Sequence, residues 1–178
     1  MKSWLLSGPM DHWRVGVKNN TWGVEEGKHA VKSCWEKATP GDLLYFYATD
    51  PIKSFVGVGI YVGRAVQRIP LWPEEKSLGK TKYTHRIFFK PLVFVDEGMQ
   101  LLTISPTDIG VTVSASMNAM SFVGDAELRK RIQLEWRIIL PSTNDAALRQ
   151  IKYMKWKMMI LSVARFVLGK WVNISLGI

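Results

Sequence analysis

Two tryptophans of this sequence lie in polar stretches instead of apolar, periodic ones. Trp22 follows three polar residues, Asn19-Asn20-Thr21, and Trp72 lies inside the polar segment 67–82. An indole face can stack on a nucleic-acid base, which contributes about 1–3 kcal/mol for each base. Each of these tryptophans is therefore expected either to cover one end of the fold or to bind a base.

Positively charged residues flank both tryptophans. Lys18 precedes Trp22, and the cations that follow Trp72 are Lys76, Lys80, Lys82 and Arg86. Such side chains can hold a phosphate backbone while an aromatic ring contacts a base, and the alternative is a solvated charged loop. The whole chain carries a net charge of +9, with the positive excess in residues 1–97 and 126–178. This charge favours a polyanionic partner, although other basic proteins have the same sign.

The residue types needed for catalysis or metal binding are scarce. Neither the three histidines, His12, His29 and His85, nor the single cysteine, Cys34, belongs to a recognisable nucleophile, base or metal-ligand pattern. The acidic pairs at 25–26 and 74–75 lie in polar segments, where we expect solvated carboxylates whose pKa is not tuned by burial. The sequence therefore predicts no catalysis, no metal and no cofactor. One cysteine cannot form an internal disulfide, which fits a reducing, cytoplasmic setting.

The surrounding sequence predicts the elements that would position these residues. Aromatic and β-branched side chains predict strands at 4–6, 43–48, 55–66 and 83–95. Helix formers predict a helix over 25–38, and residues 11–17 form either a short helix or an extended link. We expect a strand near 109–113 and a loop over 114–120. Apolar residues at helical spacing predict helices over 126–140 and, after Pro141, over about 145–168.

The strand predicted over 55–66 carries three glycines, Gly57, Gly59 and Gly63, on one face. Glycines on one face relieve crowding where a barrel bends, whereas a dinucleotide-binding fingerprint needs a different spacing and a following helix. Pro91 is expected at a sheet edge or a bulge. No apolar stretch reaches the ~18 residues of a membrane-spanning helix, so we expect a soluble protein that does not bind membranes.

An ordered series of short motifs covers most of the chain, from Trp4 to about Arg131. It consists of a strand ending at Ser7, then Asn20-Thr-Trp-Gly-Val24, Pro40-Gly-Asp-Leu-Leu-Tyr-Phe-Tyr47, Val56-Gly-Val-Gly-Ile-Tyr61 and Tyr83-Thr-His-Arg-Ile-Phe-Phe-Lys-Pro-Leu92. In this order the motifs resemble EVE domains, which are PUA-like barrels related to YTH readers. The resemblance implies an α+β fold, a PUA-like twisted β-barrel of five to six strands with flanking helices, over residues 1–140. Residues 141–178 would form a basic C-terminal helical extension.

The resemblance also implies which residues bind. Trp22 would form the aromatic wall of a base pocket, and Trp72 resembles the second tryptophan of the YTH cage. Ser7 and Asn20 would offer polar contacts to the edge of the base. The remaining residues expected to contact nucleic acid are Lys18, Lys80, Lys82, Arg86, Ser116 and Asn118.

The leading hypothesis is a reader that flips a modified, for example methylated, base of DNA or RNA into a pocket between Trp22 and Trp72. The chain also resembles the N-terminal DNA-recognition domain of a McrBC-type modification-dependent restriction system. That resemblance implies a motor domain or a partner subunit reached through the C-terminal helix. Two alternatives stay open: a PUA-like RNA-binding module that flips no base, and a protein-interaction module that uses the C-terminal helix.

Overall fold

The computed structural model describes residues 1–27, 35–96, 103–110, 113, 120–122 and 126–141. Residues Met1–Pro141 form one compact unit. The elements in chain order are β1 (Ser3–Gly8), α1 (Met10–Lys18), β2 (Thr21–Val24), β3 (Leu43–Ala48), β4 (Ser54–Val66), α2 (Pro73–Leu78), β5 (His85–Phe94), the 3-10 helix η3 (Thr107–Ile109), β6 (Met120–Phe122) and α3 (Ala126–Glu135).

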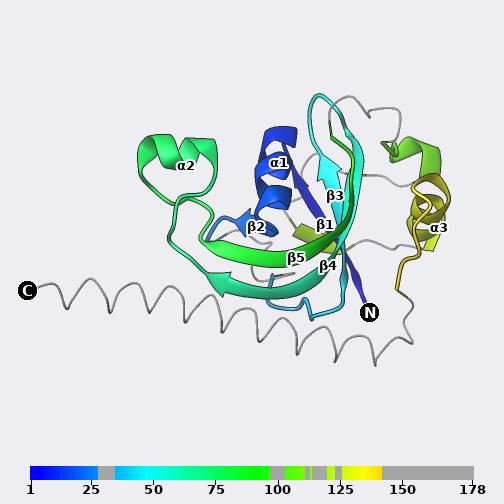
Figure 1. Cartoon of the computed structure of the whole chain (residues 1–178), viewed down its shortest axis with the longest axis horizontal. Coiled ribbons are helices and arrows are strands. Elements are labelled where there is room, and N and C mark those ends of the chain that lie inside the picture. The colour runs from blue at the N-terminus through cyan, green and yellow to red at the C-terminus, as the bar shows by residue number, and fades with distance from the viewer. Residues whose placement is uncertain (28–34, 97–102, 111–112, 114–119, 123–125, 142–178) are drawn as a thin grey trace, which may run out of the picture. The chain divides into compact units, whose positions relative to one another are not determined.

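The six described strands form one strongly curved sheet in the order β2-β5-β4-β3-β1-β6. Strands β1 and β3 pair in parallel, and the other pairs are antiparallel. Figure 1 shows how β4 and β5 bend together around the core, with α1 and α3 lying against different parts of the sheet. This arrangement confirms the predicted α+β fold, a twisted sheet of five to six strands with flanking helices.

The bend of the sheet depends on glycines in β4. A Cβ at Gly57 or Gly59 would lie 2.6 or 2.8 Å from the Phe46 ring of the neighbouring strand, which is closer than real Cβ atoms come. The register between β4 and β5 shifts at Val58/Gly59, where Gly59 pairs with Pro91. Both the predicted role of these glycines and the predicted bulge at Pro91 are therefore confirmed.

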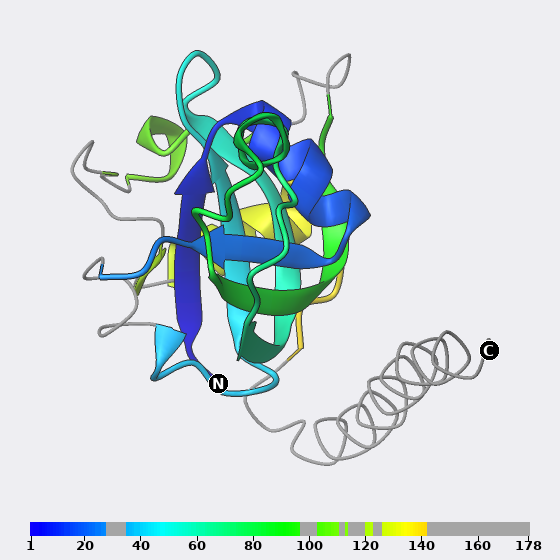
Figure 2. The same cartoon turned by 90° about the vertical axis from the view of Figure 1, so that its left-hand side faces the viewer.

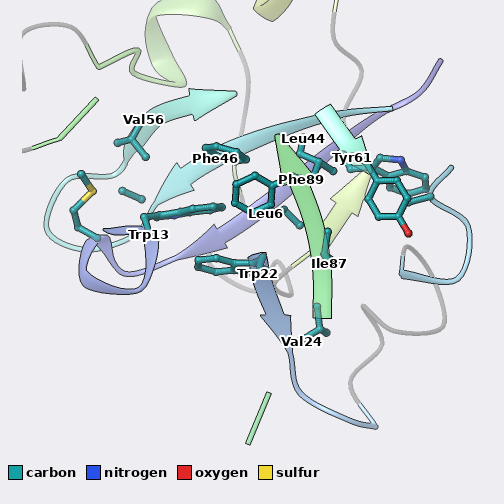
Figure 3. Close-up of a cluster of buried hydrophobic side chains, with 14 residues drawn as sticks. Leu6, Trp13, Trp22, Val24, Leu44, Phe46, Val56, Tyr61, Ile87 and Phe89 are labelled. Atoms are coloured by element: carbon teal, nitrogen blue, oxygen red, sulfur yellow. The ribbon is translucent and has the colours of Figure 1, made fainter. Parts of the chain in front are cut away.

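Buried side chains pack on both faces of the sheet. In β3, Leu44 and Phe46 join a cluster that contains the rings of Trp13 and Trp22, whereas Leu43 and Tyr45 face the opposite cluster. The first of these clusters is drawn in Figure 3. Burial of both faces explains why this strand reads as a continuous apolar run and not as an alternating one. Leu128 and Ile132 of α3 complete the second cluster.

Several predicted boundaries need correction. Residues 21–24, expected to lie in a polar loop, form strand β2 paired with β5. The helix predicted over 25–38 does not begin at Glu25, because a turn follows β2 and Gly27 has a left-handed φ of 79°. The polar segment 67–82 contains the short helix α2. Ile109 ends a 3-10 helix instead of beginning a strand, and α3 ends at Glu135, before Leu140.

Other predictions fall on residues that the structure does not describe. These include most of the loop at 114–119, residues 28–34 of the predicted helix, and the helix at 145–168. Residues 11–17 lie in the α-helix α1, which settles the choice between a helix and an extended link. In the described part of the chain, no helix combines the length and the apolar composition needed to cross a membrane.

Candidate functional site

The ring of Trp22 lies at the junction of β1, α1 and β2. It stacks on Trp13 of α1, as Figure 3 shows. The two ring centroids are 3.9 Å apart and the interplanar angle is 19°. Two glycines make room for it, because a Cβ at Gly8 would lie 2.6 Å from the Trp22 ring and one at Gly16 would lie 3.3 Å from it. Trp22 is only 3% exposed. Trp22 thus covers the end of the barrel core, which is one of the two roles expected for it from the sequence.

Trp72 comes from a different part of the chain and meets Trp22. It precedes helix α2 in the α2 lobe, which we define as residues 67–84, between β4 and β5 (Figure 2). The two indole centroids are 6.3 Å apart at an interplanar angle of 81°. The edge of Trp72 rests on Gly23, where a Cβ would come within 2.5 Å of the ring. The two tryptophans that the resemblance assigns to one pocket therefore lie against each other.

The prediction of an open pocket between the two indoles is wrong. A base stacked between two rings needs parallel planes separated by about 7 Å, twice a normal carbon–carbon contact. The Trp22 and Trp72 rings are instead nearly perpendicular, and Trp72 is 1% exposed. An edge-to-face pair of this kind is a usual packing of aromatic side chains.

The carboxylate of Glu75 holds the α2 lobe in shape. Its Oε1 accepts hydrogen bonds from the backbone N–H groups of Lys82 and Tyr83, at 2.8 and 2.7 Å. Its Oε2 accepts from the N–H groups of Leu71 and Trp72, at 2.8 and 3.3 Å. One side chain thereby joins the two stems of the lobe. The prediction of a solvated carboxylate is wrong for Glu75, which is fully buried.

Burial and hydrogen bonding act on the pKa of Glu75 in opposite directions. Burial alone would raise this pKa, because a charged carboxylate is poorly solvated inside the protein. The backbone N–H donors and the nearby charge of Arg86 outweigh that effect, and the net pKa of Glu75 is lowered. Glu75 is therefore a charged residue that anchors the lobe.

Arg86 is the buried partner of Glu75. Its Nη2 lies 3.3 Å from Oε2 of Glu75 and donates to the carbonyl of Ile69 at 2.9 Å. The guanidinium carbon lies 4.3 Å from the centroid of the Trp72 ring, a cation–π contact. Arg86 is 1% exposed, so its predicted surface position, where it would hold a phosphate, is wrong. Burial lowers its pKa, while Glu75 opposes that shift.

His12 connects α1 to the α2 lobe. Its Nε2 lies 2.9 Å from Oε1 of Glu74, and its backbone carbonyl accepts a hydrogen bond of 3.4 Å from the indole N–H of Trp72. Its ring lies beside those of Trp22, Trp72 and Tyr83. Burial lowers the pKa of His12, although the charge of Glu74 acts in the opposite direction.

The indole N–H of Trp22 is buried and has no hydrogen-bond partner. The N–H groups of the neighbouring Trp13 and Trp72 donate to backbone carbonyls. The Cζ2 edge of Trp22, which continues from the N–H, faces Gly8 at the end of β1, and Ser7 is half-buried in the adjacent position. An unpaired buried donor carries a desolvation cost of about 1–3 kcal/mol, so this atom is a candidate ligand contact.

The other predicted contact residues divide by exposure. Lys18, at the end of α1, and Lys80 and Lys82, in the α2 lobe, are exposed, and the ammonium of Lys82 lies 5.3 Å from the Tyr83 ring centroid. Asn20 is exposed in a left-handed turn with φ 53°, where its carbonyl accepts from the N–H of Phe89. Ser116 and Asn118 lie outside the described residues.

Sequence reasoning missed several members of this site. Trp13, His12 and Tyr83 were not among the predicted residues, yet their rings lie against Trp22 or Trp72. A usable signal existed for Trp13, because a helix over 11–17 places it on an apolar face with Met10. For Glu75 the available signal was the helix start at Trp72-Pro73, which places Glu75 at the third helical position, where its side chain can reach back to the N-cap N–H. The described residues contain no cluster of side chains that could hold a metal ion.

Comparisons with known proteins concern the fold. No protein-family model matches this chain, and no curated protein matches it in sequence. The YTH domain of Zygosaccharomyces rouxii MRB1, solved in complex with N6-methyladenosine RNA, superimposes with a TM-score of 0.51 at 11% identity. That match covers 80% of this chain and 90% of the YTH domain.

Two further structures match less closely. The Mmi1 YTH domain gives a TM-score of 0.49 at 13% identity, over 76% of this chain and 75% of that one. ASCH from Zymomonas mobilis gives 0.48 at 12% identity, over 75% and 95%. At such low identities the likeness concerns the fold. Together with the sheet order described above, the match to the MRB1 YTH domain shows that the chain has a PUA-like α+β fold.

Proposed function

We propose that this chain is a nucleic-acid-binding module that reads one base, a modified one, at Trp22. The observation that carries the proposal is the unpaired, buried N–H of Trp22 at the end of β1. A planar base presents ring nitrogens and carbonyl oxygens that accept such a hydrogen bond. The MRB1 YTH domain, which has the same fold, was solved with RNA that contains a modified base, and this supports the proposed ligand class.

Electrostatics support the same partner. The chain carries a net charge of +9, and the exposed Lys18, Lys80 and Lys82 belong to the elements on either side of Trp22. Lysines so placed would contact the phosphates of a strand whose base is extruded. Extrusion costs a few kcal/mol, which stacking on an indole and one buried hydrogen bond would offset.

The burial of Trp22 sets a requirement for this mechanism. Trp13 covers one face of the indole, so an incoming base would contact the remaining face or the N–H edge. The side chains around the end of β1 must shift to admit it, because the indole is 3% exposed. Trp72 and Tyr83 would then act as walls of the opened site instead of as a preformed cage.

The test is a binding panel on the full chain. Fluorescence anisotropy would measure the affinity for single-stranded DNA and RNA oligonucleotides that carry unmodified adenine, N6-methyladenine, cytosine or 5-methylcytosine. We expect one modified oligonucleotide to bind more tightly than its unmodified counterpart. Trp22→Phe keeps an aromatic ring but loses the N–H donor, and should reduce this preference about tenfold.

Trp136→Phe is the matched control, because Trp136 packs against the opposite core cluster. It should leave the preference for the modified base unchanged. The proposal fails if the wild-type chain shows no preference among the oligonucleotides, or if the two variants lose it equally.

A second candidate function is an RNA-binding module that flips no base. The burial of both Trp22 and Trp72 favours it, because such a module needs only shape and phosphate contacts. Tight binding to RNA, weaker binding to DNA and no effect of modification would select this function. Affinity for either polymer that barely falls between 50 and about 200 mM salt would favour the protein-interaction alternative.

The proposed reader would serve as the targeting module of a modification-dependent restriction system, as the resemblance to McrBC-type domains implies. In that role the chain would act with a motor that hydrolyses a nucleotide. Co-purification of the tagged chain with such an NTPase from its native cells tests this part. A tagged chain that purifies alone would leave the base-reading proposal standing and remove the restriction role.

A further inference from the structure

Arg64 stands out among the charged residues that the proposed reading site does not use. It is an exposed residue of β4, close to the point where the chain leaves the sheet for the α2 lobe. Its backbone pairs with Ile87 of β5. Three residues later, the backbone N–H of Gln67 donates a hydrogen bond to the carbonyl of Thr84 at the base of the lobe. Figure 1 shows this end of β4 and β5 below α2.

The guanidinium of Arg64 is held in place by Trp35. Its carbon lies 4.9 Å from the centroid of the Trp35 ring, and its Nη1 donates to the backbone carbonyl of Trp35. Its charge also acts on the hydroxyl of Tyr61, where it opposes the effect of burial on the pKa of that group. Burial raises the pKa of Tyr61 to about 12, so this hydroxyl is neutral and does not compensate the positive charge.

No carboxylate among the described residues pairs with Arg64. Three other arginines of the described chain differ in this respect: Arg14 contacts Asp11, Arg86 contacts Glu75, and Arg131 contacts Glu135. Arg64 is therefore exposed, charged and fixed by neutral groups. A surface arginine normally loses side-chain entropy when it binds an anion, and a guanidinium that is already immobilised loses less.

We propose that Arg64, held by Trp35, binds a backbone phosphate of the nucleic acid that the chain recognises. A guanidinium has five N–H donors in a planar fork that matches the oxygens of a phosphate, and its contacts here leave part of that fork available. The occupant is a phosphodiester of the strand next to the base that is read. This inference rests on the proposed function, since its ligand is the same nucleic acid.

The experiment compares two charge-removing substitutions in the full chain. Arg64→Gln removes the fixed guanidinium, and Lys90→Gln removes another exposed cation from β5. Affinity for a fluorescein-labelled 12-nucleotide strand would be measured from 50 to 300 mM KCl. We expect Arg64→Gln to weaken binding roughly tenfold and to reduce the slope of log affinity against log salt by about one. Lys90→Gln should change both quantities far less.

Two further arms separate a fixed contact from general charge. Arg64→Lys keeps the charge but loses the planar fork, and should bind more weakly than wild type. Replacing single phosphates of the strand by neutral methylphosphonates should identify one position that weakens binding to the wild type. That same replacement should cause no further loss of affinity in the Arg64→Gln variant.

The outcomes distinguish this inference from the proposed function. Arg64→Gln should weaken binding to modified and unmodified strands equally, because a phosphate contact does not depend on the identity of the base. If Arg64→Gln behaves like Lys90→Gln while Trp22→Phe still loses base preference, the phosphate site is overturned and the reader stands. If the wild-type chain binds no oligonucleotide, both proposals are overturned.

Discussion

The indoles of Trp13 and Trp22 stack 3.9 Å apart, yet only one of them has a partner for its N–H group. Trp13 donates to the backbone carbonyl of Tyr47 at 2.9 Å, whereas the N–H of Trp22 has no acceptor. Both rings are almost completely buried. Comparing substitutions at these two residues therefore separates the free energy of packing an indole from that of its hydrogen bond.

This difference predicts unequal costs for two similar substitutions. Trp13→Phe loses ring volume and leaves the Tyr47 carbonyl without its donor, whereas Trp22→Phe loses ring volume only. We expect Trp13→Phe to lower the free energy of unfolding by about 1 kcal/mol more than Trp22→Phe. Urea unfolding followed by circular dichroism measures both. Equal losses would indicate that the Trp22 N–H is hydrogen-bonded within the folded chain.

The buried pair of Glu75 and Arg86 predicts a large effect from a small substitution. Glu75→Gln removes the charge that balances the buried guanidinium and leaves one or more backbone donors of the lobe without an acceptor. Breaking one partner of a buried ion pair costs about 3–5 kcal/mol, so this variant should be strongly destabilised. The neighbouring Glu74→Gln is the control, because Glu74 is partly exposed and should cost less than about 1 kcal/mol.

Much of the fold could be predicted from local sequence. Strands β3, β4 and β5 were identified from runs of aromatic and β-branched residues, and the glycines of β4 indicated where the sheet bends. These features are local, so a single sequence carries them. Strand β2 was missed because four residues with a glycine have little strand character, and it forms through pairing with β5.

The burial of the site residues could not be predicted in the same way. In β5 the side chains of Ile87 and Phe89 face the core, so strand alternation places Arg86 on the other face. That face would be solvated in a bare sheet. The α2 lobe covers it, because Glu75 ties together backbone groups from both stems of the lobe. The polar segment 67–82 therefore supplies one partner of a buried ion pair, and its Trp72 is buried as well.

His12 predicts how stability depends on pH near neutrality. Burial lowers its pKa in the folded chain below the usual 6.5, against the opposing charges of Glu74, Asp11 and Glu75 and with a small lowering from Lys82. The unfolded chain therefore binds a proton at a higher pH than the folded chain does. The stability that neutral His12 contributes is fully present above about pH 6.5 and is lost as the pH falls through the folded pKa.

The measurement is the free energy of unfolding between pH 7.5 and 5.5 for the wild type and for His12→Gln. Wild-type stability should decrease as the pH falls across this range, and His12→Gln should show a smaller decrease. His85→Gln, which leaves the His12 environment intact, should keep the larger, wild-type decrease. If His12→Gln and the wild type lose stability in parallel, then His12 has the same proton affinity in the folded and the unfolded chain. Its contact with Glu74 would in that case compensate its burial completely.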